Sequence, residues 1–124
     1  MDESLNLISE KIIGCAFSVS NTLGAGFLEK VYQNALALEL INAGLEIEKE
    51  KAITIFYKGT IVGEYFADIL VNQQVIIETK AVQSLNEIHQ AQLLNYLKAT
   101  GLPLGLLFNF GTPKVQIKRM LHDK

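Results

Sequence analysis

Two short segments of the sequence are apolar at every position, Ile69-Leu70-Val71 and Val75-Ile76-Ile77. A strand with one face in water alternates apolar and polar residues, whereas an uninterrupted apolar run is typical of a strand covered on both faces. The residues between the two runs, Asn72-Gln73-Gln74, fit a hairpin loop. We therefore expect two central strands of a sheet with other elements packed against each face.

Apolar residues recur at helical spacing in three other segments. The first ends at the break Gly24-Ala25-Gly26, and the second runs from about Phe27 to Asn42, with Gly44 as its stop. The third is capped near Asn86 and stops at Gly101. These signals predict two helices before the central strands and one helix after them.

Further strands are expected around the central pair. Ile53, Ile55 and Tyr57 alternate before the turn Lys58-Gly59, which makes a three-stranded meander with the segments 61–71 and 75–82. Two more strands are predicted near 104–110 and 115–121. The order helix, helix, three strands, helix, two strands belongs to the α/β or α+β class, and without a repeat or compositional break we expect residues 1–124 to form one domain.

Composition excludes several classes of protein. An apolar content of 49% argues against disorder, and a single cysteine, Cys15, allows no internal disulfide and no cysteine-ligated metal, so it is expected in the core. The first residues are acidic where a signal peptide is basic, and no apolar stretch approaches the roughly 18 residues of a membrane span. We expect a cytoplasmic protein.

The net charge of −2 gives no support to binding nucleic acid through bulk positive charge. The charge is uneven, however, with −5 on residues 1–50 and +3 on residues 51–124, so a polyanion would prefer the second half. The basic cluster near the end of the chain is equally well explained as a solvated tail; it consists of Lys114, Lys118, Arg119 and Lys124.

Ionisable residues interrupt the central strands at Asp68, Glu78 and Lys80. A buried carboxylate without a partner costs several kcal/mol, so two of them among branched apolar residues call for an explanation. If the hairpin loop has three residues, Asp68 lies opposite Glu78, with Cβ atoms about 5 Å apart. A two-residue loop would instead put the two carboxylates on opposite faces.

Two carboxylates at this separation repel each other unless a cation lies between them. Oxygen ligands of this kind suit Mg²⁺ or Mn²⁺, which takes one or two protein carboxylates together with a substrate phosphate. Lys80, on the same face as Glu78, could then orient or deprotonate a water molecule or neutralise charge on the phosphate. The alternative is that Glu78 and Lys80 form an ordinary ion pair at a strand edge.

Other polar residues have weaker signals. Gln92 and Tyr96 project from one face of the third helix, either as part of a site or as the polar edge of an amphipathic helix. Glu29 is either a first-turn acid favoured by the helix dipole or a third carboxylate for the metal. His89 and His122 have no partner at ligand spacing, and no phosphate-binding glycine loop of the Walker or Rossmann kind occurs.

The segment Gly26-Phe27-Leu28-Glu29-Lys30-Val31-Tyr32 resembles the signature of the GxxExxY family. The likeness continues through most of the chain, in the segments 35–40, 63–68, 78–82, 91–97 and 105–111. That family is similar to a compact branch of the PD-(D/E)xK nuclease superfamily, whose core is a helix, three strands, a helix and a strand. The resemblance implies a restriction-endonuclease-like core with an extra N-terminal helix and a C-terminal strand.

The resemblance also implies residue roles. Asp68 matches the motif aspartate, and Glu78 with Lys80 matches the (D/E)xK pair, although Ala67 replaces the proline of the superfamily's name. Glu29 matches an acidic residue of the first core helix. Gln92 with Tyr96 resembles a Q-x-x-x-Y element that helps to bind and position substrate. The implied metal ligands are Asp68, Glu78, Glu29 and the Thr79 carbonyl.

We therefore expect a Mg²⁺-dependent or Mn²⁺-dependent nuclease that hydrolyses phosphodiester bonds, with DNA as the preferred substrate. The alternative is a non-catalytic module of the same fold that binds nucleic acid or a protein partner. A third expectation concerns oligomers: if the apolar segment 102–110 lies at a sheet edge, it invites self-pairing.

Overall fold

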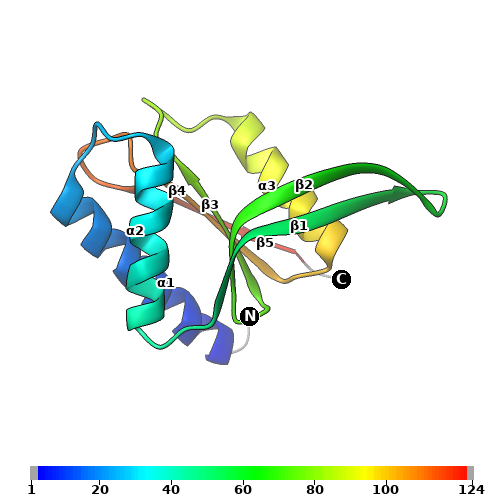
Figure 1. The fold of residues 1–124 in the computed structure, drawn as a ribbon, viewed down its shortest axis with the longest axis horizontal. Helices are drawn as coiled ribbons and strands as arrows, with labels where there is room; N and C mark the ends of the chain where they lie inside the picture. Colours follow the sequence, from blue (N-terminus) through cyan, green and yellow to red (C-terminus); the bar gives the residue numbers. More distant parts are fainter. Residues whose placement is uncertain (1–2, 123–124) are drawn as a thin grey trace.

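The computed structural model describes residues 3–122, which form a five-stranded sheet between two layers of helices (Figure 1). Helices α1 and α2 pack on one face of the sheet and α3 on the other, each layer with its own apolar core. The elements are α1 Glu3–Leu23, α2 Glu29–Asn42, β1 Ile47–Tyr57, β2 Thr60–Val71, β3 Val75–Lys80, α3 Glu87–Thr100, β4 Leu104–Asn109 and β5 Gln116–Leu121.

Spatial order in the sheet follows chain order, β1-β2-β3-β4-β5. Neighbouring strands are antiparallel except for β3 and β4, which are parallel and joined through α3. A parallel pair needs a crossover long enough for a helix, and the predicted third helix supplies it. The predicted α+β class and element order are confirmed, with α2 beginning two residues later than expected and β3 ending at Lys80.

The central hairpin has the expected three-residue loop, because Val71 pairs with Val75 and Ile69 with Ile77. Asn72 and Gln73 have φ angles of 50° and 57°, and the Gln74 N–H donates to the Val71 carbonyl at 2.9 Å. Two successive positive φ values give the tight turn a twist that matches its strands. Every residue from Val75 to Thr79 is buried, which confirms a strand covered on both faces.

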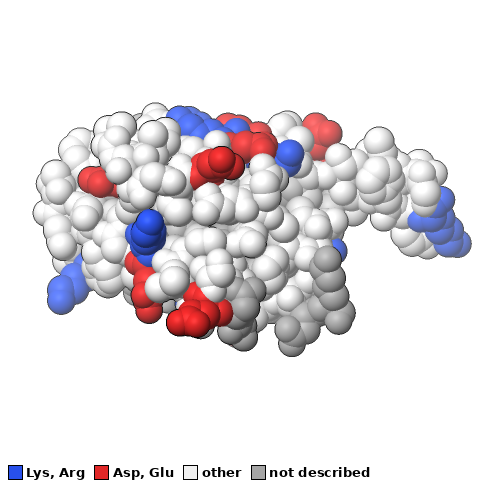
Figure 2. Space-filling view, turned by 90° about the horizontal axis from the view of Figure 1, so that it is seen from below, with Lys and Arg blue, Asp and Glu red and all other residues white. Residues whose placement is uncertain are grey.

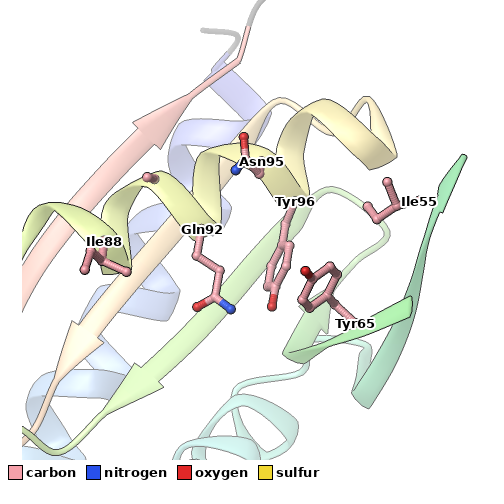
Figure 3. A pocket seen from close by; sticks show the side chains of 7 residues that line it. Ile55, Tyr65, Ile88, Gln92, Asn95 and Tyr96 are labelled. Carbon is pink, nitrogen blue, oxygen red and sulfur yellow. The ribbon is translucent and has the colours of Figure 1, made fainter. Parts of the chain in front are cut away.

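Strands β2 and β3 pair over only three residues, whereas β1 and β2 remain paired as far as the Lys58-Gly59 turn. Residues 51–67 therefore form a hairpin arm that extends away from the body of the sheet (Figures 1 and 2). On its inner side the arm faces α3, where the Tyr65 and Tyr96 rings lie 5.7 Å apart (Figure 3).

The apolar segment near the end of the chain is not at a sheet edge. Strand β4 lies between β3 and β5, and all six of its residues are buried. The expectation that segment 102–110 offers an edge for self-pairing is therefore wrong, because its backbone groups already pair with a strand on either side. Cys15 is buried in the core as predicted, and no helix within residues 3–122 is long and apolar enough to cross a membrane.

The end of β4 is joined to the chain that follows β3. The fully buried Asn109 side chain accepts from the Val82 N–H at 3.0 Å and donates to the Val82 carbonyl at 2.9 Å. The Phe110 N–H donates to the Lys80 carbonyl at 2.8 Å. Gly111 passes so close that a Cβ there would lie 2.2 Å from the Val82 oxygen. These contacts hold the backbone from the Lys80 carbonyl to Val82.

Replacing Gly111 by alanine should destabilise the protein by more than about 3 kcal/mol, because the new methyl group meets backbone atoms that cannot move aside cheaply. Gly14→Ala is the matched control: Gly14 is exposed in α1 with no atom near the added Cβ, so this change should stabilise by about 0.5–1 kcal/mol. Urea unfolding of both variants measures the difference. Equal stabilities would contradict the close packing at Gly111.

Candidate active site

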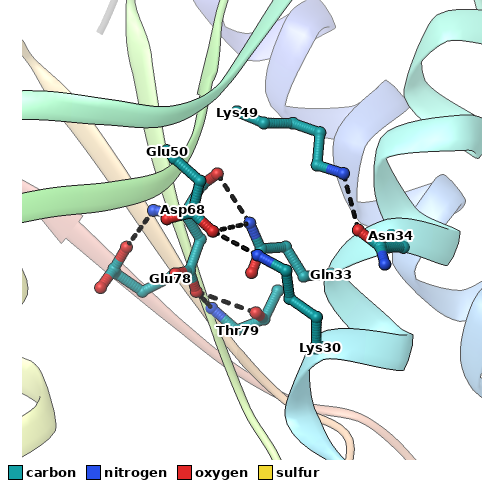
Figure 4. Close-up of polar contacts among 8 residues, drawn as sticks. All are labelled: Lys30, Gln33, Asn34, Lys49, Glu50, Asp68, Glu78 and Thr79. Atoms are coloured by element: carbon teal, nitrogen blue, oxygen red, sulfur yellow. Dashed lines mark hydrogen bonds and ion pairs between the residues drawn. The ribbon is translucent and has the colours of Figure 1, made fainter.

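The first residues beyond the last β2–β3 pair are Asp68 and Glu78, and we call the point where the two strands separate the strand fork. At the fork, backbone N–H groups donate to the Asp68 and Glu78 carboxylates across the two strands, where a regular sheet would use backbone carbonyls (Figure 4). Glu78 Oε2 accepts from the Asp68 N–H at 2.8 Å. Asp68 Oδ2 accepts from the Thr79 N–H at 2.7 Å and from the Thr79 hydroxyl at 2.9 Å. The predicted register thus brings the two acids together across the fork.

Each carboxylate has one oxygen left over. Within residues 3–122, neither Asp68 Oδ1 nor Glu78 Oε1 takes part in a hydrogen bond or an ion pair. Glu78 is only 5% exposed, and burial followed by the negative charge of Asp68 raises its pKa to about 8. Two acids with free oxygens and mutual repulsion fit a cation, which would relieve the repulsion and coordinate both.

Lys80 and Glu29 lie around this pair. Burial raises the pKa of both Glu78 and Glu29, and the positive charge of Lys80 opposes that rise at each of the two carboxyls. Lys80 forms no ion pair in the described part of the chain, so the alternative of a Glu78–Lys80 ion pair is wrong.

Glu29 is the first residue of α2, and its pKa is raised by burial and by Asp68. It faces the acidic pair without joining it: among residues 3–122, no three His, Cys, Asp or Glu side chains are close enough to hold one metal ion. Mg²⁺ commonly uses only one or two protein carboxylates, so the Asp68–Glu78 pair suffices as its protein anchor.

The segment Gly26–Tyr32, which carries the GxxExxY-like motif, explains the position of Glu29. Gly26 has a φ of 120°, which a residue with a side chain rarely adopts. Tyr32 is fully buried and stacks on Phe110 with ring centroids 4.9 Å apart. Its hydroxyl donates to the Gly24 carbonyl at 2.6 Å and accepts from the Phe27 N–H at 3.1 Å. The motif therefore ties the loop before α2 to the core, and so fixes where the helix starts.

Sequence reasoning missed two residues beside the site, Gln33 and Glu50. Gln33 is 3% exposed, and its amide donates to the Asp68 carbonyl and to Glu50 Oε1, both at 3.1 Å (Figure 4). Glu50 has a φ of 53° and also pairs with Lys30. A signal for Gln33 was present, because it is a polar residue on the apolar stripe of α2, in helical register with Leu36, Ala37 and Leu40.

Helix α3 supplies Gln92 and Tyr96 from the other side of the sheet. Tyr96 is 4% exposed, and its pKa is raised to about 12 by burial and then by the charges of Glu78 and Asp68. The Gln92 side chain lies beside the Tyr96 ring (Figure 3). Tyr96 is therefore buried rather than on a solvated edge of the helix, and Gln92 is half-buried next to it.

The histidines and the basic cluster lie elsewhere. His89 accepts from the Asn86 N–H at 3.4 Å and completes the predicted cap of α3. His122 follows β5, away from the strand fork. In the basic cluster, Arg119 donates to Ser9 of α1 at 2.7 Å. Lys114 and Lys118 are exposed, and Lys124 lies outside the described residues.

Comparison with known proteins agrees with this geometry. A family model described as the PD-(D/E)XK nuclease superfamily matches residues 6–120, and no curated protein matches the sequence. Among solved structures, the fold is similar to the crystal structure of an alkaline exonuclease (LHK-Exo) from Laribacter hongkongensis, at a TM-score of 0.56 and 15% identity. The likeness covers 76% of this chain and 56% of the exonuclease chain, and it shows a restriction-endonuclease-like fold.

The raised pKa of Glu78 predicts how stability changes with pH in the absence of divalent ions. Between about pH 5 and pH 8 the folded protein keeps a proton on Glu78 that the unfolded chain releases, so the free energy of unfolding falls as pH rises. The slope from this group is at most about 1.4 kcal/mol per pH unit. Glu78→Gln retains an acceptor for the Asp68 N–H but has no titrating carboxyl group. In this variant the free energy of unfolding should therefore fall less steeply between about pH 5 and pH 8.

Urea unfolding in EDTA at several pH values measures the effect. The contributions of the other titrating groups to the pH dependence are common to both proteins, so they cancel when the variant is compared with the parent. Glu10→Gln, at an exposed position on α1, is the control and should leave the parent's pH profile unchanged. Parallel profiles for Glu78→Gln and the parent would show that Glu78 titrates normally.

Proposed function

The chain belongs to the PD-(D/E)XK nuclease superfamily, and on this premise we propose that it is a metal-dependent nuclease that cuts DNA at the strand fork. One observation carries the proposal. Asp68 and Glu78 face each other where β2 and β3 separate, and each has a carboxylate oxygen without a hydrogen bond to the rest of residues 3–122. A protein that used this fold only as a scaffold would have no need to bury such a pair.

The proposed cation is Mg²⁺ or Mn²⁺, held by Asp68 and Glu78 with the Thr79 carbonyl as a further ligand. Glu29 faces this pair without joining it, so the ligand role implied for it by the resemblance is not carried into the proposal. When bound, such an ion polarises a phosphate oxygen and lowers the pKa of a coordinated water molecule. The Thr79 N–H and hydroxyl hold Asp68 in place, and Gln33 holds the backbone of Asp68 from the α2 side. These contacts orient the carboxylates before any ion arrives.

Lys80 is the proposed third catalytic residue. Its backbone is held by the Phe110 N–H, and its ammonium forms no ion pair with the other described residues. It can therefore hydrogen-bond to the attacking water or offset the negative charge that develops on the phosphate. Gln92 and Tyr96, from α3, are proposed to position the substrate strand beside the two acids.

Several finer assignments are proposals of the same kind. The segment Gly26–Tyr32 supports membership of the GxxExxY family, through the structural roles of Gly26 and Tyr32 and the position of Glu29. The proposed preference of this protein for DNA over RNA is taken from the superfamily alone. A single nuclease-like domain over residues 1–124 and a cytoplasmic location stay predictions from the sequence.

Cleavage by the purified protein tests the proposed activity. With Mg²⁺ or Mn²⁺ we expect cutting of at least one labelled substrate among single-stranded, double-stranded and branched DNA and RNA, and none in EDTA. Asp68→Asn, Glu78→Gln and Lys80→Met should each lower the rate by about 100-fold or more, because each removes a ligand or the general acid-base group.

Glu10→Gln and Lys11→Met are matched controls on the exposed side of α1 and should cut at the parental rate. Thermal unfolding of each variant checks that it is folded. If the site variants cut as fast as the controls, or if the parent cuts nothing, the nuclease proposal fails.

Metal binding is tested separately by calorimetry with Mn²⁺ in the absence of nucleic acid. The parent should bind the ion, and Asp68→Asn and Glu78→Gln should weaken binding at least about 10-fold, since each removes one of the two anionic ligands. Glu29→Gln should have a smaller effect, because Glu29 is not within the acidic pair. Mn²⁺ binding that does not depend on Asp68 would favour the non-catalytic module.

A further inference from the structure

A groove lies between the hairpin arm and α3, next to the strand fork (Figure 3). It has a volume of about 330 Å³ and is formed by Ile55 and Tyr65 of the arm with Ile88, Gln92, Asn95 and Tyr96 of the helix. A second hollow of about 410 Å³ shares Ile55, Tyr65 and Asn95 and continues along α3 to Lys98. We call the two hollows together the arm groove.

The walls of the arm groove combine flat apolar surface with neutral polar groups. Tyr65 is 49% exposed and presents its ring to the groove, while Ile55 and Ile88 close the two sides. The amides of Gln92 and Asn95 each offer both a donor and an acceptor. Among residues 3–122, no charged side chain lines the first hollow. This chemistry suits a planar aromatic group with polar edges, and it does not suit a phosphate.

Both ends of the arm groove lead to features that suit a nucleic acid strand. On the side of the strand fork, Tyr96 lines the first hollow and packs in one cluster with Ala67, the neighbour of Asp68, and with Ile76, two residues before Glu78. At the other end, the Lys98 side chain supplies positive charge. A strand whose scissile phosphate lay at the fork could therefore place a neighbouring base in the first hollow and a further phosphate near Lys98.

We propose that the arm groove binds an unpaired nucleobase next to the scissile phosphate, so that the substrate is a single strand or a duplex with an unpaired end. The proposal rests on the proposed nuclease function and names its substrate class. A base inside a duplex is stacked on both faces and paired at its edge, so it must leave the duplex before it can stack on Tyr65. Stacking on an aromatic side chain accepts any base, so no sequence preference is expected.

Binding of an oligonucleotide that carries one 2-aminopurine tests the proposal, because stacking quenches the fluorescence of this adenine analogue. Ca²⁺ replaces Mg²⁺ so that the strand stays intact. The parent should quench the fluorescence of the 2-aminopurine in the single strand. It should also bind this strand at least about 10-fold more tightly than the same sequence in a blunt duplex. Tyr65→Ala should weaken single-strand binding about 10-fold, as expected for the loss of one stacked base, and Tyr65→Phe should bind like the parent.

Tyr57→Ala is the matched control, since Tyr57 lies on the same arm, is 62% exposed and does not line the groove. It should bind within about twofold of the parent. Tyr65 is half-exposed, so its replacement leaves the core intact.

The possible failures are distinguishable. If Tyr65→Ala binds and cuts single strands like the parent, or if the parent prefers the blunt duplex, the arm groove does not hold an unpaired base, while Mg²⁺-dependent cutting still supports the nuclease. Normal strand binding by Tyr65→Ala is also the result expected if the groove accommodates a protein side chain instead, and it overturns the proposal. If the parent neither binds nor cuts any nucleic acid, both proposals fall together.

Discussion

The exchange of hydrogen bonds between Asp68 and Glu78 is the interaction on which the rest of the site depends. Where a regular ladder would continue, Glu78 accepts from the Asp68 N–H and Asp68 accepts from the Thr79 N–H. The strands can therefore separate without leaving these buried donors unpaired, which would cost about 1–3 kcal/mol each. The same bonds hold both carboxylates in one place and leave an oxygen on each for a cation.

Separation of the strands has consequences on both faces of the sheet. On one face, α2 brings Gln33 to the Asp68 carbonyl and Glu29 to the edge of the acidic pair. On the other, the hairpin arm diverges from β3 and leaves the arm groove between itself and α3. A single break in pairing thus creates both the acidic pair and the groove beside it.

Much of this was predictable because it rests on local rules. The apolar runs predicted the central strands, the three-residue loop predicted that Asp68 lies opposite Glu78, and the spacing of Gln92 and Tyr96 put them on one face of α3. Gln33, Glu50 and the Asn109 side chain were not found, since each bonds to a backbone or side chain far away in the sequence. The position of segment 102–110 was also misjudged, because apolar content alone does not distinguish an interior strand from an edge strand.

The sequence by itself determined the element order, the hairpin register and the residue types at the site, because helical periodicity, strand alternation and turn chemistry act over a few neighbouring residues. Only the tertiary structure decided that Glu29 faces the acidic pair without joining it, that Lys80 has no ion-pair partner among the described residues, and that Tyr65 lies against Tyr96. These outcomes depend on how the helices and the arm pack on the sheet. Such packing is set by the sum of many weak contacts between distant segments, which no local pattern records.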